Sequence, residues 1–197
     1  MDKWISESIS QNLGNTFFNY IMLFFTFLGE WGAVIIATCL GFIIYYAVKE
    51  KKLNLYFSIG LLVFGLVWIF LDGGPNPISI KNIVRRVRPY HVIDGFEKMM
   101  TSMHYKLPSR YSFPSGHSYS AFFLATLLTL KYRKLGFVLY PIACLIVLSR
   151  IWLGAHYFTD TLVGSFIGAL SAVGNYFLVK FIYKKLEEKG KSNKLCA

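Results

Sequence analysis

The sequence predicts an all-α fold, a polytopic bundle of transmembrane helices that forms a single domain over residues 1–197. Hydrophobic residues make up 55% of the chain, and they gather in runs that approach the roughly 20 residues needed to cross a bilayer. The formal net charge is +11, but the basic residues fall in short clusters between the apolar runs. This placement favours a membrane protein over a nucleic-acid-binding one, so no nucleic-acid partner is expected.

The N-terminal part, residues 1–29, holds a short apolar run at residues 16–28. This run could form a sixth span, or a helix lying at the interface with Trp4, Ile5, Ile9 and Leu13 ahead of it, and we favour the interfacial helix. The residues before it lack the basic region, apolar core and cleavage site of a signal peptide, so we expect the spans themselves to direct insertion.

Five longer apolar runs follow, at residues 31–48, 53–71, 118–130, 135–148 and 161–183. The runs at 118–130 and 135–148 reach span length only with their semi-polar flanks. Gly164, Gly168 and Ala172 recur at a spacing of four, which places small residues on one helix face and lets another helix approach closely. The polar residues 184–197 are expected to form a cytoplasmic tail.

The connection at residues 72–115 is the longest polar segment. Gly73, Gly74, Pro75 and Pro77 break a helix. Residues 79–88 are predicted to restart one, which Pro89 ends. A stretch that is apolar enough to dip toward lipid comes later in the segment: Met99, Met100, Met103 and Tyr105.

The basic residues indicate how the chain is oriented. Alternation of the five runs puts twelve on one side, which should be the cytoplasm: Lys49, Lys51, Lys52, Lys131, Arg133, Lys134, Lys180, Lys184, Lys185, Lys189, Lys191 and Lys194. Eight lie on the other side: Lys81, Arg85, Arg86, Arg88, Lys98, Lys106, Arg110 and Arg150. The bias predicts a multi-pass protein of the plasma (inner) membrane whose 72–115 segment is extracytoplasmic.

Three polar clusters fall on this outer side, and the first is KNIVRRVRP. Lys81 and Arg88 are seven residues apart, about two helical turns, so both side chains are predicted to share one helix face. On its own, the cluster is more typical of an interfacial basic helix that touches anionic headgroups. Arg85 and Arg86 receive no role.

The second cluster, PSGH, opens the run at 118–130. Ser115 is a suitable N-cap residue, and Gly116 allows the backbone to approach a ligand closely. The free N–H groups and positive dipole end of a helix N-terminus attract an anion, and His117 lies in that first turn. A capping turn with an incidental histidine explains this cluster equally well when it is taken alone.

The third cluster is SRIWLGAHYFTD. His156 and Asp160 are four residues apart, so on a helix the carboxylate can reach the imidazole and fix its tautomer. Such a pair orients a nucleophile or a base. Arg150 adds a planar guanidinium suited to phosphate oxygens. A pair of polar residues near a span end is the plainer interpretation of this cluster by itself.

Taken together, the clusters bring three cations, a helix N-terminus and two histidines to one side of the membrane. This set suits a phosphoryl group whose charge is stabilised during transfer, since one imidazole can attack phosphorus and the other can protonate the departing oxygen. No His, Cys or carboxylate set has metal-binding spacing, and Cys39, Cys144 and Cys196 predict no disulfide framework. We expect no metal and no cofactor. His91 and His104 are interpreted as loop residues.

The three clusters, K-x6-R-P at residues 81–89, P-S-G-H at 114–117 and S-R-x5-H-x3-D at 149–160, resemble the three-part signature of the type 2 phosphatidic acid phosphatases, also called lipid phosphate phosphatases. Their order and internal spacings match without a departure. The resemblance implies that His156 becomes a phosphohistidine, that Asp160 orients it, and that His117 is the general acid. It also implies a phosphate cradle formed by Lys81, Arg88, Ser115, Gly116 and Arg150, working without metal.

The resemblance implies a membrane lipid phosphatase that hydrolyses a lipid phosphomonoester or diphosphate on the extracytoplasmic face. Undecaprenyl diphosphate is the favoured substrate, because wall synthesis leaves it on that side, and phosphatidylglycerophosphate is the alternative. A lipid phosphotransferase and a non-catalytic lipid binder or transporter are further alternatives. Vanadate-dependent haloperoxidases share the signature, but they are soluble, and the long apolar runs argue against that class.

Overall fold

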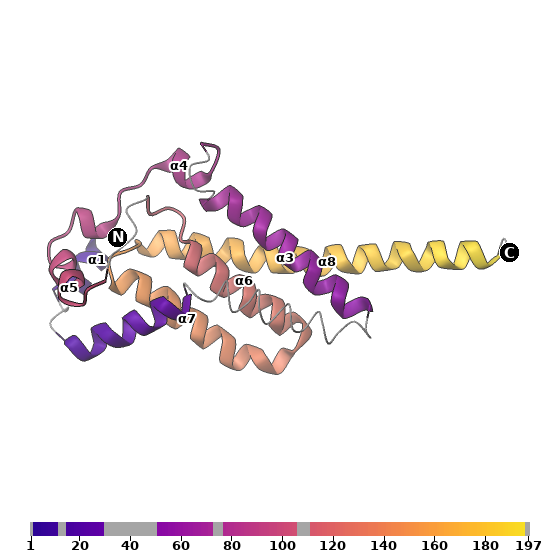
Figure 1. Cartoon of the computed structure of the whole chain (residues 1–197), viewed down its shortest axis with the longest axis horizontal. Coiled ribbons are helices and arrows are strands. Elements are labelled where there is room, and N and C mark those ends of the chain that lie inside the picture. Colours follow the sequence, from indigo (N-terminus) through magenta and orange to yellow (C-terminus); the bar gives the residue numbers. More distant parts are fainter. Residues whose placement is uncertain (1, 12–14, 30–50, 73–76, 106–110, 196–197) are drawn as a thin grey trace.

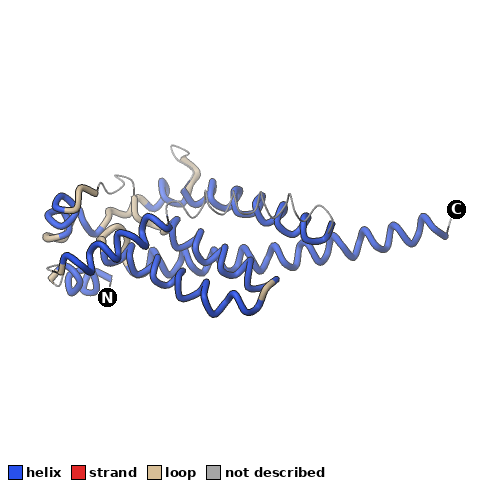
Figure 2. The backbone as a smooth tube through the Cα atoms, turned by 60° about the horizontal axis from the view of Figure 1, so that its bottom comes forward, coloured by secondary structure: helices blue, strands red, loops and turns tan. Residues whose placement is uncertain are grey.

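The structure is a computed structural model that describes residues 2–11, 15–29, 51–72, 77–105 and 111–195. Within these ranges all regular structure is helical and no strand occurs (Figure 2). The all-α prediction is therefore confirmed for the described part of the chain. The predicted span at 31–48, the residues at 73–76 and the cysteines Cys39 and Cys196 lie outside these ranges.

Four of the helices that the structure describes run side by side and form a bundle (Figures 1 and 2). They are α3 (Lys51–Asp72), α6 (Gly116–Lys131), α7 (Gly136–Trp152) and α8 (Phe158–Leu195). The shorter elements are α1 (Asp2–Ser10), the helix Thr16–Gly29, α4 (Ile80–Val84), η2 (Pro89–His91), α5 (Phe96–Ser102) and η3 (Arg133–Leu135). Most of the polar tail expected at 184–197 continues α8, which extends past the rest of the bundle (Figure 1).

Two of the described helical segments are long and apolar enough to cross a membrane, Arg133–Trp152 and Phe158–Leu186. Two further apolar helices, Thr16–Gly29 and Tyr56–Asp72, are shorter. The helix Thr16–Gly29 packs against α7: Trp152 Nε1 donates to Asn19 Oδ1 at 2.9 Å, and the hydroxyls of Thr26 and Ser149 lie 2.9 Å apart. The number of spans, five or six, stays a prediction.

The small residues of α8 allow it to lie directly against α6, as their spacing predicts. A Cβ atom added at Gly164 would come within 2.4 Å of the Ser115 carbonyl oxygen, and one at Gly168 within 2.3 Å of the Tyr119 carbonyl oxygen. Backbone therefore meets backbone at both positions. This contact aligns the N-terminal ends of α6 and α8, where the second and third sequence clusters lie.

Replacing Gly168 by alanine is expected to destabilise the bundle, because the new methyl group can be accommodated only if α6 and α8 separate. Overpacking of this kind typically costs roughly 1–3 kcal/mol. The midpoint of thermal unfolding in detergent measures the effect. Gly174→Ala is the matched control on the same helix, since a Cβ there meets nothing within 4 Å. Equal midpoints for the two variants would contradict the close approach.

A hydrophobic core beside the bundle includes residues of the 77–105 segment. It bears on the expectation that part of this segment dips toward lipid. Met99, Met100 and Met103 are buried, between 5% and 8% exposed, in a cluster with residues of the helix Thr16–Gly29 and of the loop after α7. The prediction that this stretch dips toward lipid is therefore wrong for its methionines. Their flexible side chains fill the space around Phe96, which is fully buried.

Candidate active site

The first cluster departs from the predicted helix. Ser79 caps α4, with the Asn82 N–H donating to its Oγ at 3.4 Å, but the helix ends at Val84 because Arg85 is left-handed at φ 51°. Arg88 is extended, at φ −75° and ψ 150°, as a residue before proline prefers. The prediction that Lys81 and Arg88 share one helix face is therefore wrong. Both side chains are nevertheless buried, at 4% and 2% exposed.

Lys81 meets a carboxylate that the sequence reasoning did not single out. Its Nζ lies 2.8 Å from Asp72 Oδ2 at the end of α3. This ion pair compensates the charge of the buried ammonium group and connects α4 to the bundle. A phosphate in the site would share Lys81 with Asp72.

The second cluster has the predicted cap. Ser115 is the N-cap of α6, and its Oγ accepts from the Ser118 N–H at 3.4 Å. The Ser115 N–H in turn donates to the Asp160 carbonyl oxygen at 3.0 Å, which joins the second cluster to the third. The room left by Gly116 is taken by Trp68 of α3, whose ring would be 2.7 Å from an added Cβ. The glycine is thus required for packing, and its part in a phosphate cradle stays a prediction.

The third cluster is a tight loop between α7 and α8. Gly154 has φ +64°, and the Phe96 ring packs where its side chain would be, so only glycine fits. The N–H groups of Ala155 and His156 both donate to the Arg150 carbonyl oxygen at 3.1 Å. These bonds fold the loop back onto α7 and bury His156, which is 2% exposed and lies two residues before the start of α8.

His156 therefore lies before the helix, and the predicted helical pairing with Asp160 is wrong in its geometry. The two side chains are still neighbours, with 3.7 Å between His156 Nδ1 and Asp160 Oδ2. That distance exceeds a hydrogen bond, and the same oxygen accepts from the Tyr157 N–H at 2.9 Å. Asp160 itself is fully buried.

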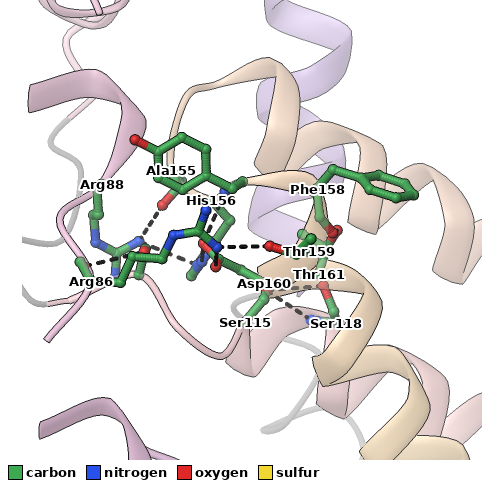
Figure 3. Close-up of polar contacts among 12 residues, drawn as sticks. Arg86, Arg88, Ser115, Ser118, Ala155, His156, Phe158, Thr159, Asp160 and Thr161 are labelled. Atoms are coloured by element: carbon green, nitrogen blue, oxygen red, sulfur yellow. Dashed lines mark hydrogen bonds and ion pairs between the residues drawn. The ribbon is translucent and has the colours of Figure 1, made fainter. Parts of the chain in front are cut away.

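Arg88 approaches the other edge of the imidazole. Its Nη1 donates to the Ala155 carbonyl oxygen at 2.7 Å and lies 3.2 Å from His156 Nε2 (Figure 3). Since the guanidinium can only donate, Nε2 carries the lone pair and Nδ1 carries the proton that faces Asp160. Burial, with the nearby charge of Arg150, lowers the pKa of Arg88 to about 10, so the group stays charged at neutral pH.

Arg150 stands out among the cations. It is fully buried, and none of its three guanidinium nitrogens has a hydrogen-bond partner among the residues that the structure describes. Its charge acts on Arg88 and on both His117 and His156, so it lies within electrostatic reach of all three. A buried charge without a partner is costly, which makes this position a strong attractor for an anion.

The environment keeps the imidazole of His156 neutral. Burial, followed by the positive charges of Arg88, Arg150 and Lys81, holds the pKa of His156 well below its ordinary value. Both burial and neighbouring cations disfavour the protonated form, so a lone pair stays available at and below neutral pH.

If His156 must be neutral to react, kcat/KM should depend on pH in a way that reflects the lowered pKa of His156. Because the His156 pKa is lowered, kcat/KM should fall on the acid side only well below the ordinary histidine range, and Arg88→Gln should move that fall to higher pH. Profiles of phosphate release by the two proteins on one substrate test this, since substrate titration is common to both. Superimposable acid limbs would contradict the assignment.

The structure thus brings Lys81, Arg88 and Arg150 within electrostatic reach of both histidines. His117 lies in the first turn of α6 and is partly buried. His91, on η2, and His104, in a turn, are exposed and lie outside the site, which agrees with their interpretation as loop residues. In the described part of the chain, no group of three His, Cys, Asp or Glu side chains could hold a metal ion.

Arg86, like Asp72, is a residue of this site that the sequence reasoning missed. Its Nη1 lies 2.6 Å from Asp160 Oδ1 (Figure 3). A signal existed: Pro89 favours an extended backbone at Arg88, and in an extended segment side chains two apart point the same way. That reading would have grouped Arg86 with Arg88.

The comparison with known families agrees with this geometry. A model of the PAP2 superfamily matches residues 52–185, which include all three clusters. The chain belongs to the PAP2 superfamily. The match covers more than half of the chain, so the resemblance seen in the sequence is confirmed at the level of the family.

Two named bacterial phosphatases resemble this chain over much of its length. The lipid A 4'-phosphatase of Porphyromonas gingivalis is 24% identical over 164 residues, covering 82% of this chain and 66% of the relative. Phosphatidylglycerophosphatase B of Bacillus subtilis is 37% identical over 136 residues, covering 62% of this chain and 60% of the relative. The aligned part is thus less than two thirds of either relative's length.

A solved structure supports the fold. The crystal structure of a transmembrane PAP2-type phosphatidylglycerolphosphate phosphatase from Bacillus subtilis superposes with a TM-score of 0.64 at 26% identity. The superposition covers 91% of this chain and 85% of the other. This PAP2 chain therefore has the helical architecture of a transmembrane protein.

Proposed function

We propose that this membrane protein is a lipid phosphatase that forms a phosphohistidine on His156. The observation that carries the proposal is Arg150, a fully buried guanidinium without a hydrogen-bond partner among the described residues, beside a buried neutral imidazole. A phosphate group supplies the acceptor oxygens and negative charge that Arg150 needs. The two relatives above are both named as phosphatases of lipids, which supports this class of reaction.

In the first step, the lone pair on His156 Nε2 attacks phosphorus while the bond from phosphorus to the leaving oxygen breaks. That oxygen takes a proton from His117. Because the cations that keep His156 neutral also act on His117, His117 gains this proton together with the anionic substrate, whose negative charge offsets theirs. Lys81, Arg88 and Arg150 stabilise the charge on the phosphoryl oxygens. Arg88, which lies 3.2 Å from Nε2, must turn its N–H toward the phosphate and so release the lone pair.

In the second step, water attacks phosphorus, and the bond from phosphorus to Nε2 breaks. His117, now neutral, takes the proton from the water, and inorganic phosphate leaves with the site restored. Asp160 faces the proton on Nδ1 and stabilises the charge that His156 gains when phosphorylated. The cations supply positive charge of the kind that metal ions supply in other phosphoryl-transfer enzymes.

Two substrates are candidates. The positive-inside bias supports an extracytoplasmic site in the plasma membrane, which favours undecaprenyl diphosphate. Phosphatidylglycerophosphate is favoured instead by the names of the Bacillus subtilis relative and of the similar crystal structure. Both present a terminal phosphate on a lipid, and three cations suit either one.

The proposal is tested by phosphate release from the purified protein in detergent, with EDTA present and His156→Ala as the blank. Undecaprenyl diphosphate and phosphatidylglycerophosphate are compared side by side. Release from either substrate that is absent in the blank supports the phosphatase, and the ratio of kcat/KM values assigns the substrate. Release that stops with EDTA would contradict the metal-independent chemistry. No release from either would refute the proposed function and favour a transferase or a lipid transporter.

A further inference from the structure

Both terminal nitrogens of the Arg86 side chain bind protein groups at or beside the third cluster. Nη1 donates to Asp160 Oδ1 at 2.6 Å and to Thr159 Oγ1 at 2.7 Å, and Nη2 donates to Asp2 Oδ2 at 2.8 Å. The guanidinium carbon also lies 4.0 Å from the centroid of the Tyr157 ring. Nη1 and Nη2 of Arg86 thus both have hydrogen-bond partners, whereas those of Arg150 have none among the described residues.

Asp2 reaches this arrangement from α1. Its Oδ1 accepts from the Thr159 N–H at 3.3 Å, and its Oδ2 accepts from the Thr159 hydroxyl as well as from Arg86. One carboxylate at the start of α1 therefore holds both Arg86 and the first turn of α8. The bonds with Thr159 and Arg86 outweigh burial and lower the pKa of Asp2, so this carboxylate is ionised at neutral pH.

The two oxygens of Asp160 face different partners as a result. Oδ1 takes the Arg86 bond, and Oδ2 takes the Tyr157 N–H and faces His156 Nδ1 at 3.7 Å. Asp160 is fully buried, so without a cation its charge would be uncompensated. Burial raises the pKa of Asp160, and the charge and hydrogen bond of Arg86 oppose that rise. Arg86 thus favours the ionised carboxylate and holds it in one rotamer, with the oxygen that faces the imidazole fixed.

We propose that Arg86 is a positioning residue for Asp160 and His156, and that Asp2 of α1 holds Arg86 in that place. The inference rests on the proposed function, since it concerns the orientation of the reacting imidazole. Figure 3 shows Arg86 pointing toward Thr159 and Asp160, with Arg88 directed toward Ala155 and His156. The two neighbouring arginines therefore have separate tasks, positioning for Arg86 and phosphate contact for Arg88.

This division predicts a specific kinetic pattern. Arg86→Gln should lower kcat by roughly 10- to 100-fold, as losing the partner that orients a metal ligand does in metalloenzymes, and should leave KM unchanged. Asp2→Asn should also lower kcat, by a smaller factor than Arg86→Gln. Asp2→Glu, which keeps the carboxylate, should lower kcat less than Asp2→Asn. In the Arg86→Gln background, Asp2→Asn should add nothing, because both act on one carboxylate.

The test measures kcat and KM for hydrolysis of a short-chain phosphatidic acid in detergent. Glu7→Gln is the matched control on α1: its carboxylate pairs with Lys3 at 3.6 Å, where both side chains are exposed, and kcat should not change. A rise in KM with unchanged kcat in Arg86→Gln would overturn positioning and assign Arg86 to phosphate binding. Equal effects of Asp2→Asn in both backgrounds would also overturn it.

The same experiment separates this inference from the function on which it rests. A wild-type protein that hydrolyses phosphatidic acid, with Arg86→Gln at full kcat, leaves the phosphatase standing and rejects the positioning role. A wild-type protein that releases no phosphate from this substrate or from the two lipids above rejects the proposed function, and the positioning role with it.

Discussion

Replacing His156 by alanine is expected to reduce phosphate release to the uncatalysed background. The change removes the only atom that can carry the phosphoryl group in the proposed mechanism, Nε2, and the remaining cations can then bind phosphate without accepting it. Loss of the general acid is less severe, since such a group usually contributes ~10²–10⁴ in rate, so His117→Ala should retain slow turnover.

Two measurements check this expectation. Turnover of the two variants is compared with that of His91→Ala, a control histidine that is exposed on η2 and should behave as wild type. Brief exposure to a substrate labelled in its phosphate should leave acid-labile label on the wild-type protein and none on His156→Ala. Substantial turnover, or label, in His156→Ala would show that another group is the nucleophile.

Replacing Arg150 by methionine is expected to move activity and stability in opposite directions. Activity should fall by roughly 10²–10³, the effect of losing one strong charge-stabilising donor in a site. Stability without ligand should rise by about 1–4 kcal/mol, because a fully buried charge without a partner among the described residues is replaced by an apolar side chain of similar length. Few substitutions of a buried residue are stabilising, so the sign is diagnostic.

Thermal unfolding in detergent, with and without orthovanadate as a phosphate mimic, tests the second expectation. Vanadate should raise the midpoint of the wild-type protein and leave that of Arg150→Met unchanged, since only a filled site compensates the charge. Arg133→Met, at an exposed position on η3, is the control for the loss of one arginine. A lower midpoint for Arg150→Met than for wild type would mean that Arg150 is paired in the free protein.

Several features of the site could be predicted from the sequence because their causes are local. The cap at Ser115 depends on a hydroxyl three residues before its donor, and the close approach of α8 depends on glycines at helical spacing. The apolar runs predicted α3, α6, α7 and α8 because hydropathy and helical length are properties of contiguous residues.

The helix over residues 79–88 was predicted by the same local reasoning and proved shorter, because the left-handed Arg85 and the following proline outweighed the seven-residue spacing. The pairing of His156 with Asp160 was likewise predicted on one helix, but α8 begins at Phe158, two residues after His156. Lys81 and Arg88 still both act on His156, and the loop bonds to Arg150 and Arg88 place His156 beside Asp160 without the expected helical geometry.

The sequence by itself determined the all-α class, the three clusters at helix ends and the chemical types of the groups they bring to the site. Only the tertiary structure decided which charges are compensated. Asp72 pairs with Lys81, Arg86 pairs with Asp160 across 74 residues, and Asp2 pairs with Arg86 across 84, whereas Arg150 is buried with no partner among the described residues. Burial and partnership of a charge depend on segments far apart in the chain, and no spacing or composition encodes them locally.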